Sequence, residues 1–165
     1  MYSETFNTPM GTVLIRASAQ GITHVDFVDS EIPADRPNAL TTACRRQLQA
    51  YLDGKCKTFD LPLDQRGTAF QKSVWNSLLK IPFGQAVSYR EIADMINNRK
   101  AVRAVGAANG KNPIAIIVPC HRVIGADRTL TGYAGGLQRK AWLLEHEGIA
   151  FNGGLENHQC DLFDQ

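Results

Sequence analysis

The chain has 165 residues, of which 44% are hydrophobic and 21% charged. That length suits one compact domain or two small ones, and the composition excludes a disordered tail, a collagen-like fibre and a coiled-coil rod. No stretch approaches about 18 consecutive apolar residues, and the first five residues carry neither a basic patch nor an apolar run. We therefore expect no membrane span, no signal peptide and a cytoplasmic location, where cysteines stay reduced.

The net charge of +2 is unevenly distributed along the chain. Residues 64–148 contain 12 Lys and Arg against 6 Asp and Glu, a net +6, whereas residues 1–63 carry −1 and residues 149–165 carry −3. A basic segment is typical of a protein with a polyanionic partner, nucleic acid first, although a solvated basic face has the same composition. The cysteines show no C-x-x-C spacing, so no structural zinc site is expected.

The first third of the chain is predicted to form strands followed by a helix. Turn signals at Thr8-Pro9-Met10-Gly11 and Gln20-Gly21 separate loosely alternating apolar strands within the first 30 residues. A loop with two prolines follows, and residues 39–52 have the pattern of an amphipathic helix that ends at Asp53-Gly54. Its inward face is expected to comprise Leu40, Ala43, Leu48, Tyr51 and Leu52. Residues 55–67 are the best linker, with a domain boundary near residue 65.

The second part of the chain is predicted to be mostly helical. Helices are expected at 68–80, after the capping box of Ser88 and Glu91, at about 99–109, and at 137–147. The two short helices on either side of Asn97-Asn98 form a helix-turn-helix pattern. Between these helices and the last one, residues 114–118 are a continuous apolar run, which predicts a buried strand or a buried extended segment. The tail from residue 152 is polar.

The second helix of this pair has an unusual surface. Its small side chains would let the backbone approach a narrow partner, and Arg103 projects from among them and could enter a groove. The alternative is that the alanines pack against another helix while Arg103 makes a surface ion pair.

The sharpest chemical feature is Pro119-Cys120-His121-Arg122-Val123, directly after the apolar run. A neighbouring imidazole would raise the thiolate fraction of Cys120, directly or through a water. Glu147, placed in the last turn of a helix against the helix dipole, could orient the histidine in a Cys–His–Glu relay. The alternatives are a small buried cysteine beside a satisfied histidine, and an ordinary exposed glutamate.

This motif resembles that of the O6-alkylguanine-DNA alkyltransferases. The same family resemblance covers Arg103-Ala104-Val105-Gly106-Ala107-Ala108-Asn109, Asn112-Pro113, Thr131-Gly132-Tyr133-Ala134-Gly135-Gly136 and Trp142 to Gly148, with matching spacing between the blocks. The resemblance runs from about Phe70 to Gly148 and is weak before it. It implies an α/β N-terminal domain of ribonuclease-H-like type (residues 1–65), with a small antiparallel sheet plus a helix. A mostly α C-terminal domain with a helix-turn-helix (66–150) and a polar tail (151–165) would follow.

The resemblance also implies the activity and its residues. Cys120 would irreversibly accept the alkyl group of a flipped-out O6-alkylguanine, or of O4-alkylthymine, once per molecule and without a cofactor or a metal. His121 would be the base acting through a water, Glu147 would orient it, and Asn112 would be a hinge to the active-site strand. Tyr89 would press on the phosphate beside the lesion and donate to the guanine. The partner would be double-stranded DNA, bound in the minor groove by a monomer with no membrane contact.

Further residues follow from the same comparison. The base pocket would be formed by Val123, Tyr133, Ala134 and Gly135, with Val123 and the Cys120 carbonyl accepting from the guanine amine. The DNA-facing residues would be Tyr89, Arg90, Arg103, Ala104, Asn109 and Arg122, and Arg103 would fill the gap left by the extruded base. Two departures stand out, because some members have serine at Ala134 and a larger apolar residue at Asn109.

Three other functions remain open from the residues alone: a non-catalytic DNA-binding regulator, a cysteine hydrolase that turns over repeatedly, and a redox-sensing thiol protein. The presence of Cys120 argues against a non-catalytic regulator, because alkyltransferase-like regulators lack the cysteine. The basic half and the small-faced helix do not call for a hydrolase.

Overall fold

The computed structural model describes residues 1–29 and 35–152, which form two compact units. The first comprises Met1–Gly67 together with Pro113–Ile117, and the second comprises Thr68–Asn112 and the chain from Val118 onward. The expected polar tail lies almost wholly outside the described residues. Within those residues, no helix combines the length and the apolar character needed to cross a bilayer.

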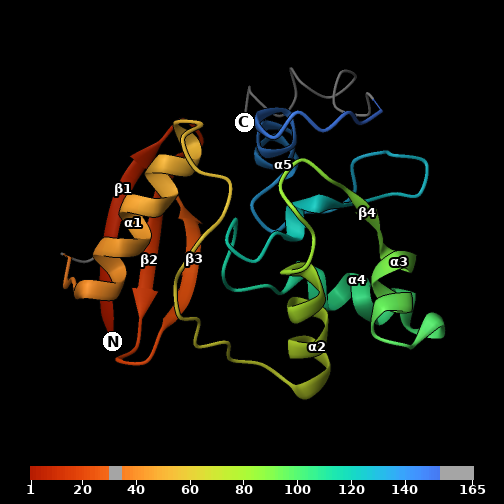
Figure 1. The fold of residues 1–165 in the computed structure, drawn as a ribbon, viewed down its shortest axis with the longest axis horizontal. Coiled ribbons are helices and arrows are strands. Elements are labelled where there is room, and N and C mark those ends of the chain that lie inside the picture. The colour runs from red at the N-terminus through yellow and green to blue at the C-terminus, as the bar shows by residue number, and fades with distance from the viewer. Residues whose placement is uncertain (30–34, 153–165) are drawn as a thin grey trace. The chain divides into compact units, whose positions relative to one another are not determined.

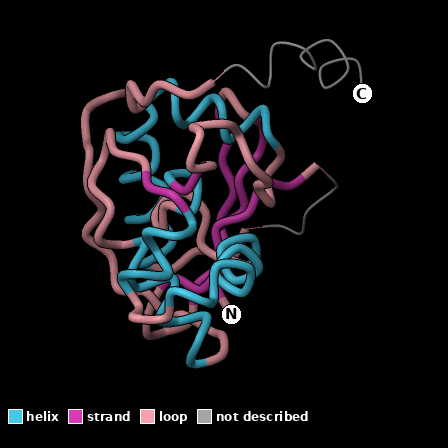
Figure 2. Tube along the Cα trace, turned by 90° about the vertical axis from the view of Figure 1, so that its right-hand side faces the viewer, coloured by secondary structure: helices cyan, strands magenta, loops and turns pink. Residues whose placement is uncertain are grey.

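The first unit is a three-stranded antiparallel sheet with one helix (Figure 1). Its elements are β1 (Tyr2–Thr8), β2 (Gly11–Ala17), β3 (Ile22–Val28) and α1 (Ala39–Leu52). The strands lie in sequence order and pair from Tyr2 with Ala17 to Thr8 with Gly11, so the first predicted turn is confirmed; Figure 2 shows the three strands side by side. Gly11 has φ of 110°, a conformation that glycine adopts without strain.

Helix α1 has the bounds that the apolar pattern predicts, and Asn38 caps it by accepting from the Thr41 N–H. Its buried face differs in part from the expected one, because Thr41 and Cys44 are buried while Leu40 and Ala43 are only half-buried. Thr41 can be buried because its hydroxyl donates to the Glu4 carboxylate at 3.1 Å, and Glu4 also pairs with Arg45.

The apolar run at 114–118 is buried, but it is not a strand. Val25 of β3 donates to the Pro113 carbonyl at 3.0 Å and accepts from the Ala115 N–H at 3.1 Å, which makes a single bridge to Ile114. The pairing stops there because Ile116 has φ of 71° and the Ile117 N–H turns back to the Ala115 carbonyl at 2.8 Å. The run therefore forms a tight turn at Ile116 instead of continuing the strand pairing. A β-branched residue in the left-handed region is strained, so the surrounding packing must hold Ile116 in this conformation.

The second unit is helical around a very short parallel pair of strands. Its elements are α2 (Ala69–Leu78), β4 (Val87–Ser88), α3 (Tyr89–Met95), the 3-10 turn η1 (Arg99–Ala101), α4 (Val102–Gly110), the 3-10 turn η2 (Cys120–Arg122), β5 (Val123–Ile124) and α5 (Leu137–His146). Helices α3 and α4 are the predicted helix-turn-helix pair, and the capping box of Ser88 and Glu91 opens α3. Buried Trp75 of α2 anchors α4 by donating from Nε1 to the Ala108 carbonyl at 2.9 Å.

Candidate functional site

Cys120 begins the turn η2 and is 4% exposed. The Asn112 amide, just after α4, donates to the Val118 carbonyl at 2.8 Å and to Cys120 Sγ at 3.2 Å. A single side chain therefore holds both the backbone before the cysteine and its sulfur. Burial raises the pKa of the Cys120 thiol, while the Asn112 hydrogen bond and the charge of Lys140 act in the opposite direction.

His121 and Glu147 form a buried pair beside the cysteine. His121 Nε2 lies 2.7 Å from Glu147 Oε2, and both side chains are 0% exposed. Burial lowers the pKa of His121 against the effect of Glu147, so the neutral ring donates from Nε2 to the carboxylate. His121 Nδ1 then carries the lone pair, and it has no hydrogen-bond partner within residues 1–29 and 35–152. The predicted pairing of these two residues is thus present, with one basic nitrogen left over.

Arg122 completes this cluster. Its Nε donates to Glu147 Oε1 at 2.8 Å, its Nη2 to Oε2 at 3.1 Å, and its Nη1 to the Ile81 carbonyl at 2.6 Å. The Gly84 N–H adds a fourth hydrogen bond to the carboxylate at 3.0 Å. Burial acts to raise the pKa of Glu147, but the bonds from His121, Arg122 and Gly84 together hold it far below its usual range. Glu147 is therefore a permanent anion, fixed at the end of α5.

Two of the expected DNA-facing residues are not on the surface. Arg122 is 6% exposed because its guanidinium neutralises Glu147, and Asn109 is 3% exposed because it faces the Cys120 carbonyl. The prediction that they face DNA is wrong. The sequence does not reveal this, because Asn109 follows Gly106, Ala107 and Ala108, three small residues that do not distinguish the buried face of α4 from the exposed one.

The remaining DNA-facing candidates do lie on the helix-turn-helix. Arg90 on α3 and Arg103 and Ala104 on α4 are exposed, and Arg103 has no ion pair among the described residues. The expected alternative of a surface ion pair at Arg103 is thus not seen. In the pocket loop, Ala134 is exposed and its neighbours Tyr133 and Gly135 are half-buried.

Tyr89 belongs to a polar chain that sequence reasoning missed. Its hydroxyl lies 2.5 Å from Thr131 Oγ1, and Lys140 Nζ lies 3.2 Å from the same Thr131 oxygen. Lys140 is 0% exposed and also donates to the Val123 carbonyl at 2.6 Å and to the Thr131 carbonyl at 3.2 Å. Burial lowers the pKa of Lys140 to about 8, against the effect of Cys120. The only available signal was its place on the apolar face of the last helix.

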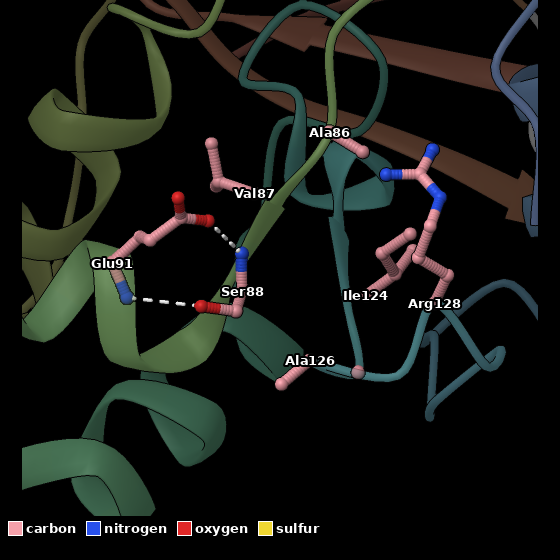
Figure 3. Close-up of a pocket in the computed structure, with 8 residues that line it drawn as sticks. Ala86, Val87, Ser88, Glu91, Ile124, Ala126 and Arg128 are labelled. Atoms are coloured by element: carbon pink, nitrogen blue, oxygen red, sulfur yellow. Dashed lines mark hydrogen bonds between the residues drawn. The ribbon is translucent and has the colours of Figure 1, made fainter.

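A cavity of about 280 Å³ lies at the start of α3 (Figure 3). Its lining consists of Ala86, Val87, Ser88, Glu91, Ile124, Gly125, Ala126 and Arg128. Its charged groups are engaged internally, because Glu91 accepts from the Ser88 N–H at 2.6 Å and Arg128 donates to the Ala150 carbonyl. No group of three or more potential metal ligands occurs among the described residues.

Comparison with known proteins covers both units. Residues 1–65 match the 6-O-methylguanine DNA methyltransferase ribonuclease-like domain, and residues 69–149 match the DNA binding domain of the same protein family. A methylated-DNA–protein-cysteine methyltransferase of Methanosarcina barkeri is 48% identical over 89% of this chain and 97% of its own length. The Haemophilus influenzae protein of that name is 42% identical over 99% and 96%.

Comparison with solved structures identifies the same family. The crystal structure of Mycobacterium tuberculosis OGT in complex with DNA matches with a TM-score of 0.82 and 46% identity, covering 89% of this chain and 92% of that one. Family models thus match most of the chain, and relatives well above 30% identity cover nearly all of it. The chain belongs to the 6-O-methylguanine DNA methyltransferase family.

Proposed function

We propose that Cys120 is the residue that receives the alkyl group. As a family member, the protein is a methylated-DNA–protein-cysteine methyltransferase, which repairs DNA by irreversible transfer of an alkyl group to its own cysteine. The observation that carries the assignment is the placement of Cys120 Sγ at 3.2 Å from the Asn112 amide, directly before the buried His121–Glu147 pair. Cys44 lies instead near the Glu4 carboxylate, which adds to the effect of burial and raises its pKa to about 12.

The thiol must lose its proton before it can attack. The acceptor is the free Nδ1 of His121, reached through one water, and the imidazolium that results is stabilised by the Glu147 anion on Nε2. Arg122 keeps Glu147 ionised in this buried place, so it acts through the carboxylate and not on DNA. The Asn112 amide and the Lys140 charge stabilise the thiolate left behind.

The thiolate then displaces the base in one step. A carbon–sulfur bond forms at the alkyl carbon while its bond to the guanine oxygen breaks, and the base leaves as an anion that takes a proton from the Tyr89 hydroxyl. Lys140 Nζ donates to the Thr131 hydroxyl oxygen, so the Thr131 hydroxyl donates to the Tyr89 oxygen. The Tyr89 hydroxyl can then donate its own hydrogen to the base. The product is a thioether on Cys120, so each molecule acts once.

DNA binding is assigned to the helix-turn-helix. The target carbon is unreachable within a stacked duplex, so the base is flipped out, at a cost of a few kcal/mol. The small side chains of α4 suit the minor groove of double-stranded DNA, and exposed Arg103 fills the vacated space. Arg90, Ala104 and Tyr89 contact the flanking backbone. The protein acts on DNA in the cytoplasm as a monomer.

The two parts of the chain divide this work. Residues 66–150 contain both the DNA-binding helices and the alkyl acceptor, together with the hydrogen bonds from Asn112 to Cys120 and from His121 and Arg122 to Glu147. Residues 1–65 support it. Val123, Tyr133, Ala134 and Gly135 line the base pocket, and a small Ala134 leaves room for alkyl groups larger than methyl.

Intact mass after mixing with an oligonucleotide that contains O6-methylguanine tests the assignment. The protein should gain one methyl group, mapped to Cys120, and Cys120→Ser should gain none while still binding the oligonucleotide. Cys56→Ser is the matched control, because Cys56 is exposed and outside the site. Repeated turnover, or methyl transfer by Cys120→Ser at the wild-type rate, would overturn the proposal.

A further inference from the structure

Asn109 is a buried polar residue beside the reacting cysteine that the proposed chemistry does not use. It is 3% exposed, and its Nδ2 donates to the Cys120 carbonyl across a long 3.4 Å. Its Oδ1 is buried and has no hydrogen-bond partner in the part of the chain that the structure describes. Buried acceptors without a partner are uncommon in folded proteins, so this one calls for a reason.

Local structure does not supply that reason. This turn of α4 is already anchored, because Trp75 Nε1 donates to the neighbouring Ala108 carbonyl. The Cys120 carbonyl is also satisfied without Asn109, since it accepts the Val123 N–H within η2. An apolar side chain of the same size would fill the space and leave no polar atom unpaired. The amide therefore weakens the fold unless something else uses its two ends.

The carbonyl that Asn109 faces is one that would read the substrate base. On the edge that carries the alkylated oxygen, one ring nitrogen further along, O6-alkylguanine presents an amine, which donates, whereas O4-alkylthymine presents a carbonyl oxygen, which accepts. The Cys120 and Val123 carbonyls can only accept, and Val123 already receives Lys140 Nζ at 2.6 Å. Two carbonyls alone suit guanine and repel the thymine oxygen.

We infer that Asn109 is a specificity-determining residue that lets this site accept both alkylated guanine and alkylated thymine. A carboxamide offers a donor and an acceptor of nearly the same shape, and a half-turn about its terminal bond exchanges them. With guanine, Oδ1 accepts from the base amine beside the Cys120 carbonyl. With thymine, Nδ2 leaves its long bond to Cys120 and donates to the base oxygen, while the Val123 N–H keeps the carbonyl satisfied. The inference rests on the proposed function.

The test compares two substrates in each variant. Single-turnover rates of methylation of Cys120 are measured with oligonucleotides of one sequence that carry O6-methylguanine or O4-methylthymine. Asn109→Leu removes both polar ends, and Asn109→Asp keeps the shape and removes the donor. In Asn109→Asp, which still accepts from the guanine amine, the thymine rate should fall relative to the guanine rate by roughly tenfold or more, the value of one hydrogen bond to a buried acceptor. In Asn109→Leu the ratio should move in the same direction but less, because guanine also loses the bond to Oδ1 and keeps only the Cys120 carbonyl. Asn76→Leu, an exposed position on α2, should leave the ratio unchanged.

The ratio separates specificity from damage, because a partly unfolded variant or a less reactive thiol slows both substrates alike. A ratio within twofold of the wild-type value in both variants overturns the inference. So does a wild-type protein that repairs guanine but never thymine. A wild-type protein that takes a methyl group from neither substrate overturns the proposed function itself, which is a different result.

Discussion

Replacing Arg122 by methionine should destabilise the protein strongly, because the change leaves a buried carboxylate short of its main partner. The guanidinium makes two hydrogen bonds to Glu147, at 2.8 and 3.1 Å, and one to the Ile81 carbonyl at 2.6 Å, and Glu147 is 0% exposed. Breaking a buried ion pair by removing one member costs about 3–5 kcal/mol. His121 and the Gly84 N–H stay on the carboxylate, which places our expectation near the lower end, about 3 kcal/mol.

Urea unfolding at pH 7 measures this loss, with Arg128→Met as the control. Arg128 also donates to a backbone carbonyl, that of Ala150, but it is exposed and should cost less than about 1 kcal/mol. A loss below about 1 kcal/mol for Arg122→Met as well would refute the view that Arg122 stabilises a buried anion.

The same variant should change the pH dependence of methyl transfer. The positive charge of Arg122 lowers the pKa of His121, so its removal raises that pKa and leaves more of the base protonated at neutral pH. The rate should fall at pH 7, and the rising limb of its pH profile should move to higher pH. A profile that keeps its position would show that His121 does not take the proton from Cys120.

Three other changes test separate parts of the site. Arg103→Ala should slow repair of duplex DNA more than reaction with the free modified base, since only the duplex has a gap to fill; equal slowing contradicts that role. Trp75→Phe removes the indole donor from the Ala108 carbonyl, which keeps the Lys111 N–H at 3.1 Å, and should cost about 0.5–1.5 kcal/mol in urea unfolding; a cost near zero would show that the indole bond does not anchor α4. Because burial lowers the pKa of Lys140 to about 8, the unfolded chain holds this proton above pH 8 and the folded protein releases it. Wild-type stability should therefore rise relative to Lys140→Met between pH 8 and 9.5, by up to about 2 kcal/mol, and parallel curves would refute the shift.

Acid should weaken the wild-type fold through the same buried cluster. Burial lowers the pKa of His121, so the folded protein keeps it neutral while the unfolded chain takes up a proton below the ordinary value of 6.5. Glu147 stays ionised in the folded state, although the unfolded chain protonates it below 4.5. Both groups make the unfolded state bind more protons, so stability falls as pH falls through each ordinary pKa.

Features set by neighbouring residues could be predicted from the sequence. The capping box at Ser88, the start of α1 at Asn38 and the turn before Gly11 each depend on side chains a few positions apart, so the pattern contains the whole interaction. The position of Glu147 at a helix end was informative for a related reason, because a carboxylate there needs compensation from elsewhere.

Features set by distant residues could not be predicted in this way. Arg122 meets Glu147 across 25 positions, so no residue near it in the sequence identifies a buried carboxylate as its partner. The run at Ile114 fits a strand by composition, but Val25 pairs with it at one point only and Ile116 turns the chain away. Only the packed structure contains these partners.

The turn that carries the cysteine is fixed mainly by buried side chains, since its adjoining strand pair is only two residues long. On one side Arg122 ties the turn to Ile81 and Glu147, and on the other Lys140 ties the Val123 carbonyl to the Thr131 loop. A single displacement at carbon needs the sulfur, the alkyl carbon and the leaving oxygen in line, and small misplacement of such groups is costly to the rate. Arg122 and Lys140, two buried cations that bind backbone carbonyls, supply this rigidity, although burying their charges costs desolvation free energy. The need to position the sulfur explains why these charged side chains lie in a core that apolar residues would stabilise better.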